Sequence, residues 1–188
     1  MGQIVVTEFI TLDGVIEDPG GSEGFERGGW AFAFDRGAEG DAFKLGELET
    51  ADAQLLGRKT YDGFAAAWPE RTDEMGFADK MNSMPKFVVS RTLDNPTWTN
   101  TTVIDGDLAA EIGKLRDRFD RDILVAGSAQ LVQSLLQEGL VDELRLMVFP
   151  VVLGKGRRLF LDEAQRGDFD LAETRQTGSV AILTLRRK

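Results

Sequence analysis

Residues 52–68 read DAQLLGRKTYDGFAAAW and carry the strongest structural pattern of the chain. A short apolar run that includes Leu55 and Leu56 meets Gly57, and apolar residues then recur at helical spacing from Tyr61 to Trp68. This change of period predicts a buried strand, a glycine turn and an amphipathic helix.

The same turn has the composition of an anion site. Arg58, Lys59 and Thr60 fall in the first turn of the expected helix. A helix N-terminus presents unpaired N–H groups and a partial positive charge, and phosphate is the anion it usually binds. The alternative is that Gly57 only turns the chain and that both cations are solvated. The stretch alone supports the two interpretations about equally.

Composition narrows the possible chemistry. A chain of 188 residues predicts a single domain, over 1–188, with a sizeable core. It contains no cysteine and no histidine, which excludes disulfides, thiolate metal sites, the Ser-His-Asp triad and the HExxH zinc site. We therefore expect no metal, and acid–base chemistry would come from carboxylates, Tyr61, lysines or water.

Charge and hydropathy bear on partners and location. The net charge of −10 argues against a general nucleic-acid-binding surface, so the few clustered cations gain weight. No apolar run reaches the ~18 residues of a membrane span, and the N-terminal residues do not follow a signal-peptide pattern. Together with the absence of cysteine, these features are compatible with a cytoplasmic protein.

Strand and helix patterns alternate along the chain. Besides the strand and helix within 52–68, strands are expected over 3–10, 86–91, 101–104, 122–126 and 141–152, and helices over 35–50, 107–119 and about 129–136. A long loop over 17–29 is typical of a functional or mobile segment. The runs 169–174 and 179–185 predict a terminal hairpin. The alternation predicts a largely parallel sheet covered by helices on both faces, with an antiparallel edge.

Three strand ends carry residues suited to phosphate. They are Gly57-Arg58-Lys59-Thr60, Ser90-Arg91 and Gly127-Ser128-Ala129-Gln130. In open parallel sheets ligands bind beyond the carboxyl ends of the strands, so these three ends could surround one nucleotide. Each signal is weak alone, because a glycine between a strand and a helix is commonly just a turn. The chain has neither a GxGxxG nor a GxxxxGK[ST] motif.

Five segments together resemble the dihydrofolate reductase superfamily, in the branch related to the riboflavin-biosynthesis reductase domain. They are TLDG (11–14), LLGRKTYDGF (55–64), FVVSRTL (87–93), ILVAGSAQL (123–131) and DELRLMVFPVVLGKGRRLF (142–160). The resemblance covers nearly the whole chain in the right order. It implies an α/β, three-layer fold with a mostly parallel central sheet, NADPH as cofactor, and a homodimer.

The resemblance also implies roles for the three strand ends. Gly57, Arg58, Lys59 and Thr60 would hold phosphates, Ser90 and Arg91 would hold the 2′-phosphate, and Gly127, Ser128, Ala129 and Gln130 would lie against the pyrophosphate. Arginine pairs well with phosphate oxygens, which agrees with this arrangement. One departure is that Gly127-Ser128 stands where the folate enzymes usually have Gly-Gly.

The substrate side offers two candidate carboxylates. Trp30 and Asp35 have the spacing of the tryptophan and acidic residue that serve the folate enzymes, although the spacer from Asp35 to Gly57 is longer here. The alternative for Asp35, which the residues favour slightly, is a helix N-cap. Asp13 matches the TLDG motif of the riboflavin branch, and its alternative is an Asp-Gly turn residue. Ile16 would border the nicotinamide by analogy and is otherwise a core residue.

These observations predict an NADPH-dependent reductase that transfers hydride to a C=N or C=O group of a small heterocycle, of pterin or aminopyrimidine type. It would resemble 5-amino-6-(5-phosphoribosylamino)uracil reductase or dihydrofolate reductase. The altered spacing around Asp35 disfavours folate reduction proper. The alternative is a non-catalytic nucleotide-binding or dimerisation module that retains the fold.

Overall fold

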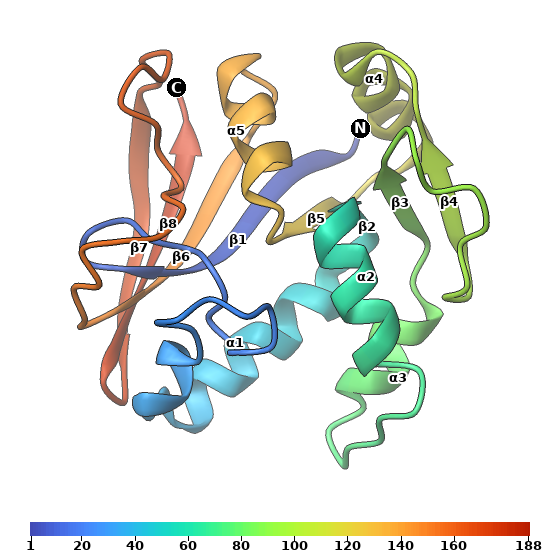
Figure 1. The fold of residues 1–188 in the computed structure, drawn as a ribbon. Helices are drawn as coiled ribbons and strands as arrows, with labels where there is room; N and C mark the ends of the chain where they lie inside the picture. Colours follow the sequence, from blue (N-terminus) through green and yellow to red (C-terminus); the bar gives the residue numbers. More distant parts are fainter.

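A computed structural model describes residues 1–188 and contains one eight-stranded sheet in the order β4-β3-β2-β5-β1-β6-β8-β7. The strands are β1 (Gln3–Thr11), β2 (Ala51–Gly57), β3 (Lys86–Val89), β4 (Thr101–Ile104), β5 (Asp122–Ala126), β6 (Glu143–Phe149), β7 (Phe169–Thr177) and β8 (Val180–Arg187). The six strands from β4 to β6 are parallel, and β8 and β7 add an antiparallel edge. The mostly parallel sheet with a terminal hairpin is thus confirmed (Figure 1).

Helices cover both faces of the sheet, which makes three layers (Figure 1). They are the 3-10 helix η1 (Trp30–Ala33), α1 (Gly37–Thr50), α2 (Arg58–Ala67), α3 (Phe77–Ser83), α4 (Leu108–Arg118) and α5 (Ala129–Gln137). None of them is long and apolar enough to cross a membrane.

The alternation of side chains along β2 builds two cores. Leu55 packs with residues of α4 and α5 in one cluster, and Leu56 packs with residues of α1, α2 and α3 in the other. Successive side chains of a strand point to opposite faces, so a continuous apolar strand can serve both layers. The chain leaves β2 into α2 on one face, and it leaves the neighbouring β5 into α5 on the other. Such a divergence opens a crevice between two strand ends.

Two expected elements are shorter in the structure than in the prediction. The strand expected over 141–152 begins at Glu143 and ends at Phe149, because Pro150 lacks the N–H group that a ladder needs. The strand expected over 86–91 stops at Val89, so Ser90 and Arg91 lie in the following loop.

Candidate functional site

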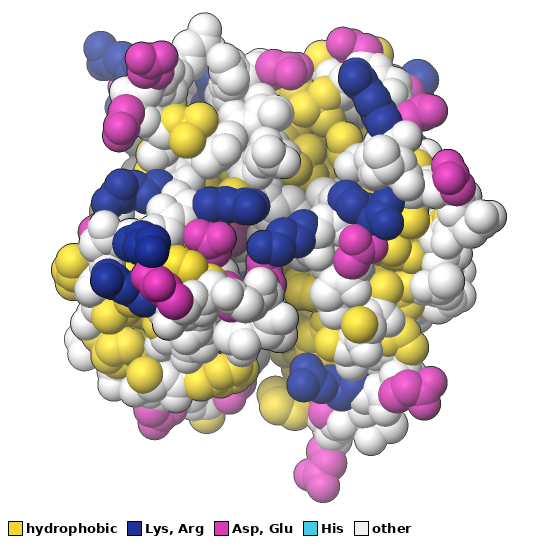
Figure 2. Space-filling model, viewed as in Figure 1, with side chains coloured by type: hydrophobic (Ala, Val, Ile, Leu, Met, Phe, Trp, Pro, Cys, Tyr) yellow, Lys and Arg dark blue, Asp and Glu magenta, His cyan; other side chains and the backbone are white.

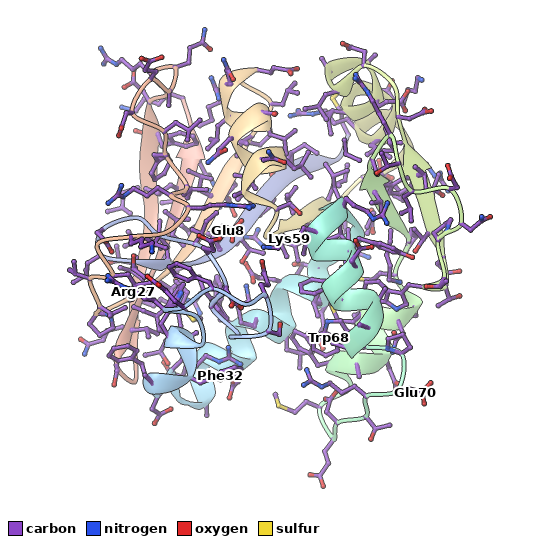
Figure 3. All side chains as sticks on the ribbon, viewed as in Figure 1. Glu8, Arg27, Phe32, Lys59, Trp68 and Glu70 are labelled. Carbon is purple, nitrogen blue, oxygen red and sulfur yellow. The ribbon has the colours of Figure 1, made fainter.

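A cleft of about 1330 Å³ lies at the carboxyl ends of the central strands. Its walls come from β1, β2, α1, α2 and the start of α5, together with part of the loop after β1. Four residues labelled in Figure 3 line it: Glu8, Phe32, Lys59 and Trp68. In Figure 2 the hollow between the two halves of this face exposes apolar side chains and has lysine and arginine side chains around it. The cleft therefore combines an apolar interior with a rim that carries both cationic and acidic side chains.

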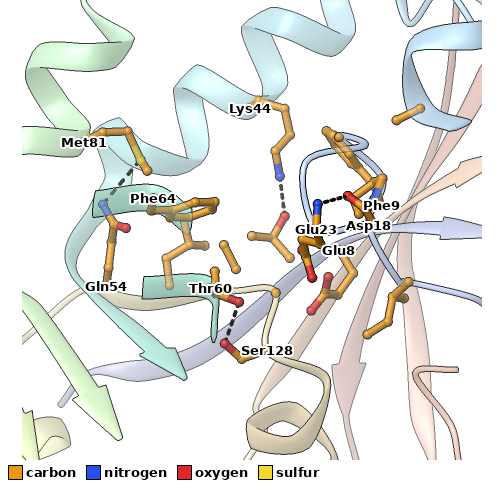
Figure 4. A pocket seen from close by; sticks show the side chains of 18 of the residues that line it. Glu8, Phe9, Asp18, Glu23, Lys44, Gln54, Thr60, Phe64, Met81 and Ser128 are labelled. Atoms are coloured by element: carbon orange, nitrogen blue, oxygen red, sulfur yellow. Dashed lines mark hydrogen bonds between the residues drawn. The ribbon is translucent and has the colours of Figure 1, made fainter. Parts of the chain in front are cut away.

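Hydrogen bonds of Ser128 to Gly57 and Thr60 join the segments that follow β5 and end β2, and Figure 4 shows the one to Thr60 inside the cleft. The Ser128 hydroxyl accepts a hydrogen bond from the Gly57 N–H at 2.7 Å and donates one to Thr60 Oγ1 at 2.7 Å. Ser128 has φ 70° and Gly127 has φ 67°, so two successive left-handed residues aim this hydroxyl across the crevice. A Cβ at position 57 would lie 2.6 Å from Ser128 Cβ. Only glycine at position 57 allows this approach of the two loops.

The N-termini of α2 and α5 both begin at this junction. No side chain caps either helix, and neither has an acidic residue in its first turn. Their first N–H groups and partial positive charges are therefore left for a ligand or for water. Two of the three predicted strand ends, 57–60 and 127–130, thus meet in one place, and all eight of their residues line the cleft.

The predicted phosphate cations differ in their partners. Arg58 Nε lies 2.9 Å from a carboxylate oxygen of Asp62, and Lys59 Nζ lies 2.7 Å from Glu23 Oε2. Arg91 is exposed and forms no ion pair. Ser90 and Arg91 follow β3, which neighbours β2, but they are not among the residues that line the cleft. Of the three predicted cations, Arg91 can therefore bind an anion without first breaking an ion pair.

Asp13 forms a tight structural contact outside the cleft lining. Its carboxylate accepts hydrogen bonds from Thr11 Oγ1 at 2.7 Å, from the Leu153 N–H at 3.1 Å and from the Gly154 N–H at 2.7 Å. Partial desolvation raises the pKa, but these hydrogen bonds outweigh it and lower the pKa of Asp13 to about 2. The residue is therefore an anion that fastens the turn after β1 to the loop after β6.

The other substrate-side candidates separate in the structure. Asp35 is exposed at the rim of the cleft, and its Oδ1 accepts a hydrogen bond from the Gly37 N–H at 2.7 Å at the start of α1. Trp30 is buried against Phe149 and lies outside the cleft lining. Ile16 is buried and does line the cleft. Of the three, Asp35 and Ile16 therefore line the cleft, and Trp30 does not.

Glu8 is a buried acid that the sequence analysis missed. Its side chain lines the cleft and is 6% exposed. Burial raises the pKa of Glu8 to about 8; Lys44 and the Gly127 N–H lower it in part, and Glu23 raises it further. The available signal was a lone glutamate inside the apolar strand QIVVTEFI. A polar residue within such a run marks either a solvated face or a site, and the sequence alone does not distinguish them.

Buried polar atoms without a partner gather in this cleft. The atoms are Glu8 Oε1, Glu47 Oε1 and Gln54 Oε1, and all three residues line the cleft. Lys44 bridges Glu47 at 2.6 Å and Thr7 Oγ1 at 2.6 Å, while the Gln54 amide N–H meets Met81 Sδ at 3.4 Å (Figure 4). Buried polar groups are normally satisfied, so these three oxygens are available to hydrogen-bond donors of a ligand or of water.

The fold and this crevice define an α/β protein of the dihydrofolate reductase-like class, with a cleft at the carboxyl ends of its parallel strands. The family model of the RibD C-terminal domain matches residues 3–183. The chain therefore belongs to the RibD C-terminal domain family.

Individual relatives agree with this assignment. The chain is 32% identical to the uncharacterized protein YyaP of Bacillus subtilis (strain 168), over 96% of this chain and 92% of YyaP. It is 29% identical to YwjB of the same organism, over 93% of this chain and 91% of YwjB. Among solved structures, a Shewanella sp. PV-4 protein named for riboflavin biosynthesis superimposes with a TM-score of 0.78 at 24% identity, over 99% of both chains. RibD of Acinetobacter baumannii superimposes with a TM-score of 0.65 at 18% identity, over 100% of this chain and 58% of RibD.

Proposed function

We propose that the protein is an NADPH-dependent reductase that transfers hydride to a C=N or C=O group of a small heterocycle of pterin or aminopyrimidine type. The observation that carries the proposal is the junction of Gly57, Thr60 and Ser128, where two uncapped helix N-termini converge in the cleft of a RibD C-terminal domain. This arrangement suits a ligand with several phosphates.

The residues present fit a dinucleotide. Gly57 and Gly127 let backbone N–H groups approach a pyrophosphate, and no acid stands in the first turn of either helix. Arg58, Lys59 and Thr60 would hold phosphates, with Ser128, Ala129 and Gln130 opposite them. Ser90 and Arg91 would meet the 2′-phosphate, because β3 ends beside β2 and Arg91 has no competing carboxylate. Bound NADPH would supply the hydride, and the protein would orient the rings and exclude water.

The remaining wall of the cleft suits the substrate. Thr7, Lys44, Glu47 and Gln54 lie on the face of the sheet covered by α1, next to the apolar side chains of Phe64 and Met81. A flat ring with N–H donors would form hydrogen bonds with the Oε1 atoms of Glu47 and Gln54, which accept none from the protein, while packing against the apolar wall. Asp35 lies at the rim, where it can contact only the outer part of such a ring.

We also propose that the protein is a homodimer. Exposed large hydrophobic side chains gather on the loops after β1 and β6: Leu12, Val152, Phe160 and Leu161. Backbone hydrogen bonds from Leu12 to Val151 and from Leu159 to Gly14 hold these loops side by side. An exposed apolar patch of this kind is typical of an interaction surface. Sedimentation of the wild type as a dimer and of Phe160→Glu as a monomer would support the proposal, and a monomeric wild type would overturn it.

The function is tested by titrating the protein with NADPH and with NADH while following nicotinamide fluorescence. We expect tighter binding of NADPH, and we expect Arg91→Ala to weaken NADPH by about tenfold, the factor of one charge-assisted contact, while leaving NADH unchanged. Arg166→Ala is the matched control, because it removes an exposed arginine that pairs with Asp168 and does not line the cleft.

Turnover separates the reductase from a binding module. Oxidation of NADPH in the presence of 5-amino-6-(5-phosphoribosylamino)uracil or dihydrofolate would support a reductase and show which ring is preferred. Binding of NADPH without oxidation by any heterocycle would favour the non-catalytic module. Failure to bind either dinucleotide would remove the nucleotide role altogether.

A further inference from the structure

Glu8 lies where the crevice cuts into the sheet. Backbone pairing between β1 and β5 ends at Thr7 and Ala126, whereas β1 stays paired with β6 as far as Thr11. One edge of β1 is therefore free of β5 from residue 8 onward, and Glu8 is the first side chain beyond the last pair. The fold thus carries a carboxyl group to the point between diverging strand ends where open α/β sheets bind ligands.

The Glu8 carboxyl is buried without being engaged by a side chain. Its Oε1 has no hydrogen-bond partner, and no cation forms an ion pair with it. The other buried carboxylates are held: Asp18 accepts two backbone N–H groups, Glu47 binds Lys44 and Thr7, and Glu143 binds Arg145 and Arg186. A buried acid that faces a cleft without such a partner is suited to meeting a ligand.

The charged groups around Glu8 leave it uncompensated. Lys44 on α1 is the cation that lowers the pKa of Glu8. Its ammonium, however, is already bound to Glu47 and Thr7. Glu23, from the loop after β1, adds a like charge and is itself paired with Lys59 of α2. Arg157, from the loop after β6, is paired with Glu17, and the start of α5 contributes only the Gly127 N–H. No free cation therefore favours the carboxylate form.

We propose that Glu8 is the proton donor of this cleft, which rests on the proposed reductase function. In the resting protein its carboxyl is neutral. As hydride adds to the carbon of a substrate C=N or C=O group, the Glu8 carboxyl gives its proton to the nitrogen or oxygen of that group. The two electrons come from the nicotinamide, the carbon is reduced, and Glu8 is left as a carboxylate that regains a proton from water.

The first test follows the Glu8 carboxyl itself by NMR in protein labelled with carbon-13 at the glutamate carboxyl. Glu8→Gln assigns the signal by its disappearance. We expect a midpoint near pH 8 in the wild type, as the buried and unpaired position requires. A midpoint close to that of an exposed glutamate would overturn the proposal, because the group would already be ionised at neutral pH.

The second test asks whether Glu8 faces the reacting rings. The oxidised nicotinamide of NADP⁺ carries a positive charge that NADPH lacks, while their phosphates are the same. If Glu8 lies beside the ring, its ionisation strengthens NADP⁺ binding relative to NADPH. We expect the ratio of the two dissociation constants to change by about tenfold between pH 6.5 and 9.5, the factor of one pKa unit of coupling.

Matched variants make the second test specific. Glu8→Gln should flatten the pH dependence of the ratio, and Glu8→Met, which also has no titrating group, serves if the glutamine variant fails to fold. Glu143→Gln should keep it, because Glu143 is equally buried at 5% exposed but binds Arg145 and Arg186 outside the cleft. If the wild type binds both dinucleotides and the ratio of their dissociation constants does not change with pH, the role of Glu8 is overturned but the proposed function is not. Absence of binding by both would overturn the proposed function together with it.

Discussion

Glu8 and Asp13 lie five residues apart, yet the protein gives their carboxyl groups opposite environments. Three donors surround Asp13 and lower its pKa to about 2, whereas burial without a partner raises the pKa of Glu8 to about 8. Asp13 sits in a turn whose neighbours are backbone N–H groups of another loop. Glu8 sits on a central strand at the edge of a cleft. Local donors, rather than distance along the chain, separate the acid with the lowered pKa from the acid with the raised pKa.

The largest expected effect is on the stability of Glu8→Gln at alkaline pH. The folded pKa of Glu8 lies above the unfolded value, so its stabilising contribution is complete below about pH 4.5 and is lost as pH rises through about 8. The free energy of unfolding of the variant should therefore exceed that of the wild type by on the order of 4 kcal/mol at pH 9. Urea unfolding at pH 5 and pH 9 measures the difference. Equal pH dependence in both proteins would contradict a buried neutral Glu8.

Asp13→Asn should show the opposite pH dependence. The folded pKa of Asp13 lies below the unfolded value, so its contribution is present above about pH 3.8 and is lost as pH falls through about 2. The variant should unfold more easily at neutral pH by about 2 kcal/mol, because the Leu153 and Gly154 N–H groups lose a charged acceptor. Thermal melts at pH 7 and pH 2 test this, and affinity for NADPH should be unchanged. A loss of turnover without loss of stability would instead support a catalytic role for Asp13.

Ser128→Ala probes the rigidity of the loops that meet beside Glu8. The hydroxyl makes two hydrogen bonds, to Gly57 and Thr60, so its removal should lower the free energy of unfolding by about 1 kcal/mol. It should also weaken NADPH binding severalfold, because the two helix N-termini lose their mutual alignment. Calorimetry with NADPH measures both effects, and Ser83→Ala on α3 is the control, because its exposed hydroxyl donates to the Lys80 carbonyl and does not line the cleft. Unchanged affinity would mean that the phosphates do not rest on this junction.

Lys44→Met should have the smallest effect of these variants, and the effect is on the pKa of Glu8. Lys44 lowers the pKa of Glu8, so its removal should move the Glu8 midpoint upward, away from that of Asp13. The shift should be within about one pKa unit, because Lys44 also neutralises Glu47 and makes no direct contact with Glu8. The carbon-13 titration measures it. A downward shift would show that another cation governs Glu8.

Much of the fold follows from short-range patterns in the sequence. The strand ending at Gly57, the helix that follows it and the apolar strand 122–126 appear where the pattern places them, because burial on both faces demands continuous apolar runs and helices demand a fixed period. The strand ending at Phe149 was overestimated, since a β-branched run continues past Pro150 although the ladder cannot.

The sequence predicts less of the candidate site than of the fold. The residues 57–60 and 127–130 could be named because glycine between a strand and a helix is a local signal. Trp30 and Asp35 could not be evaluated, because their separation along the chain does not tell which way each side chain points. The structure turns Trp30 into the core beside Phe149 and leaves Asp35 at the start of α1.

By itself, the sequence determined the order of the eight strands and of the helices α1, α2, α4 and α5, the absence of histidine and cysteine chemistry, and the glycine turns that can approach phosphate. These are properties of composition and of neighbouring residues. Only the tertiary structure decided that β1 extends beyond β5, that Ser128 joins Gly57 to Thr60, and that Glu8 rather than Asp13 is the buried acid of the cleft. Burial and hydrogen-bond partners set the pKa of a carboxyl group, and both come from segments distant in sequence.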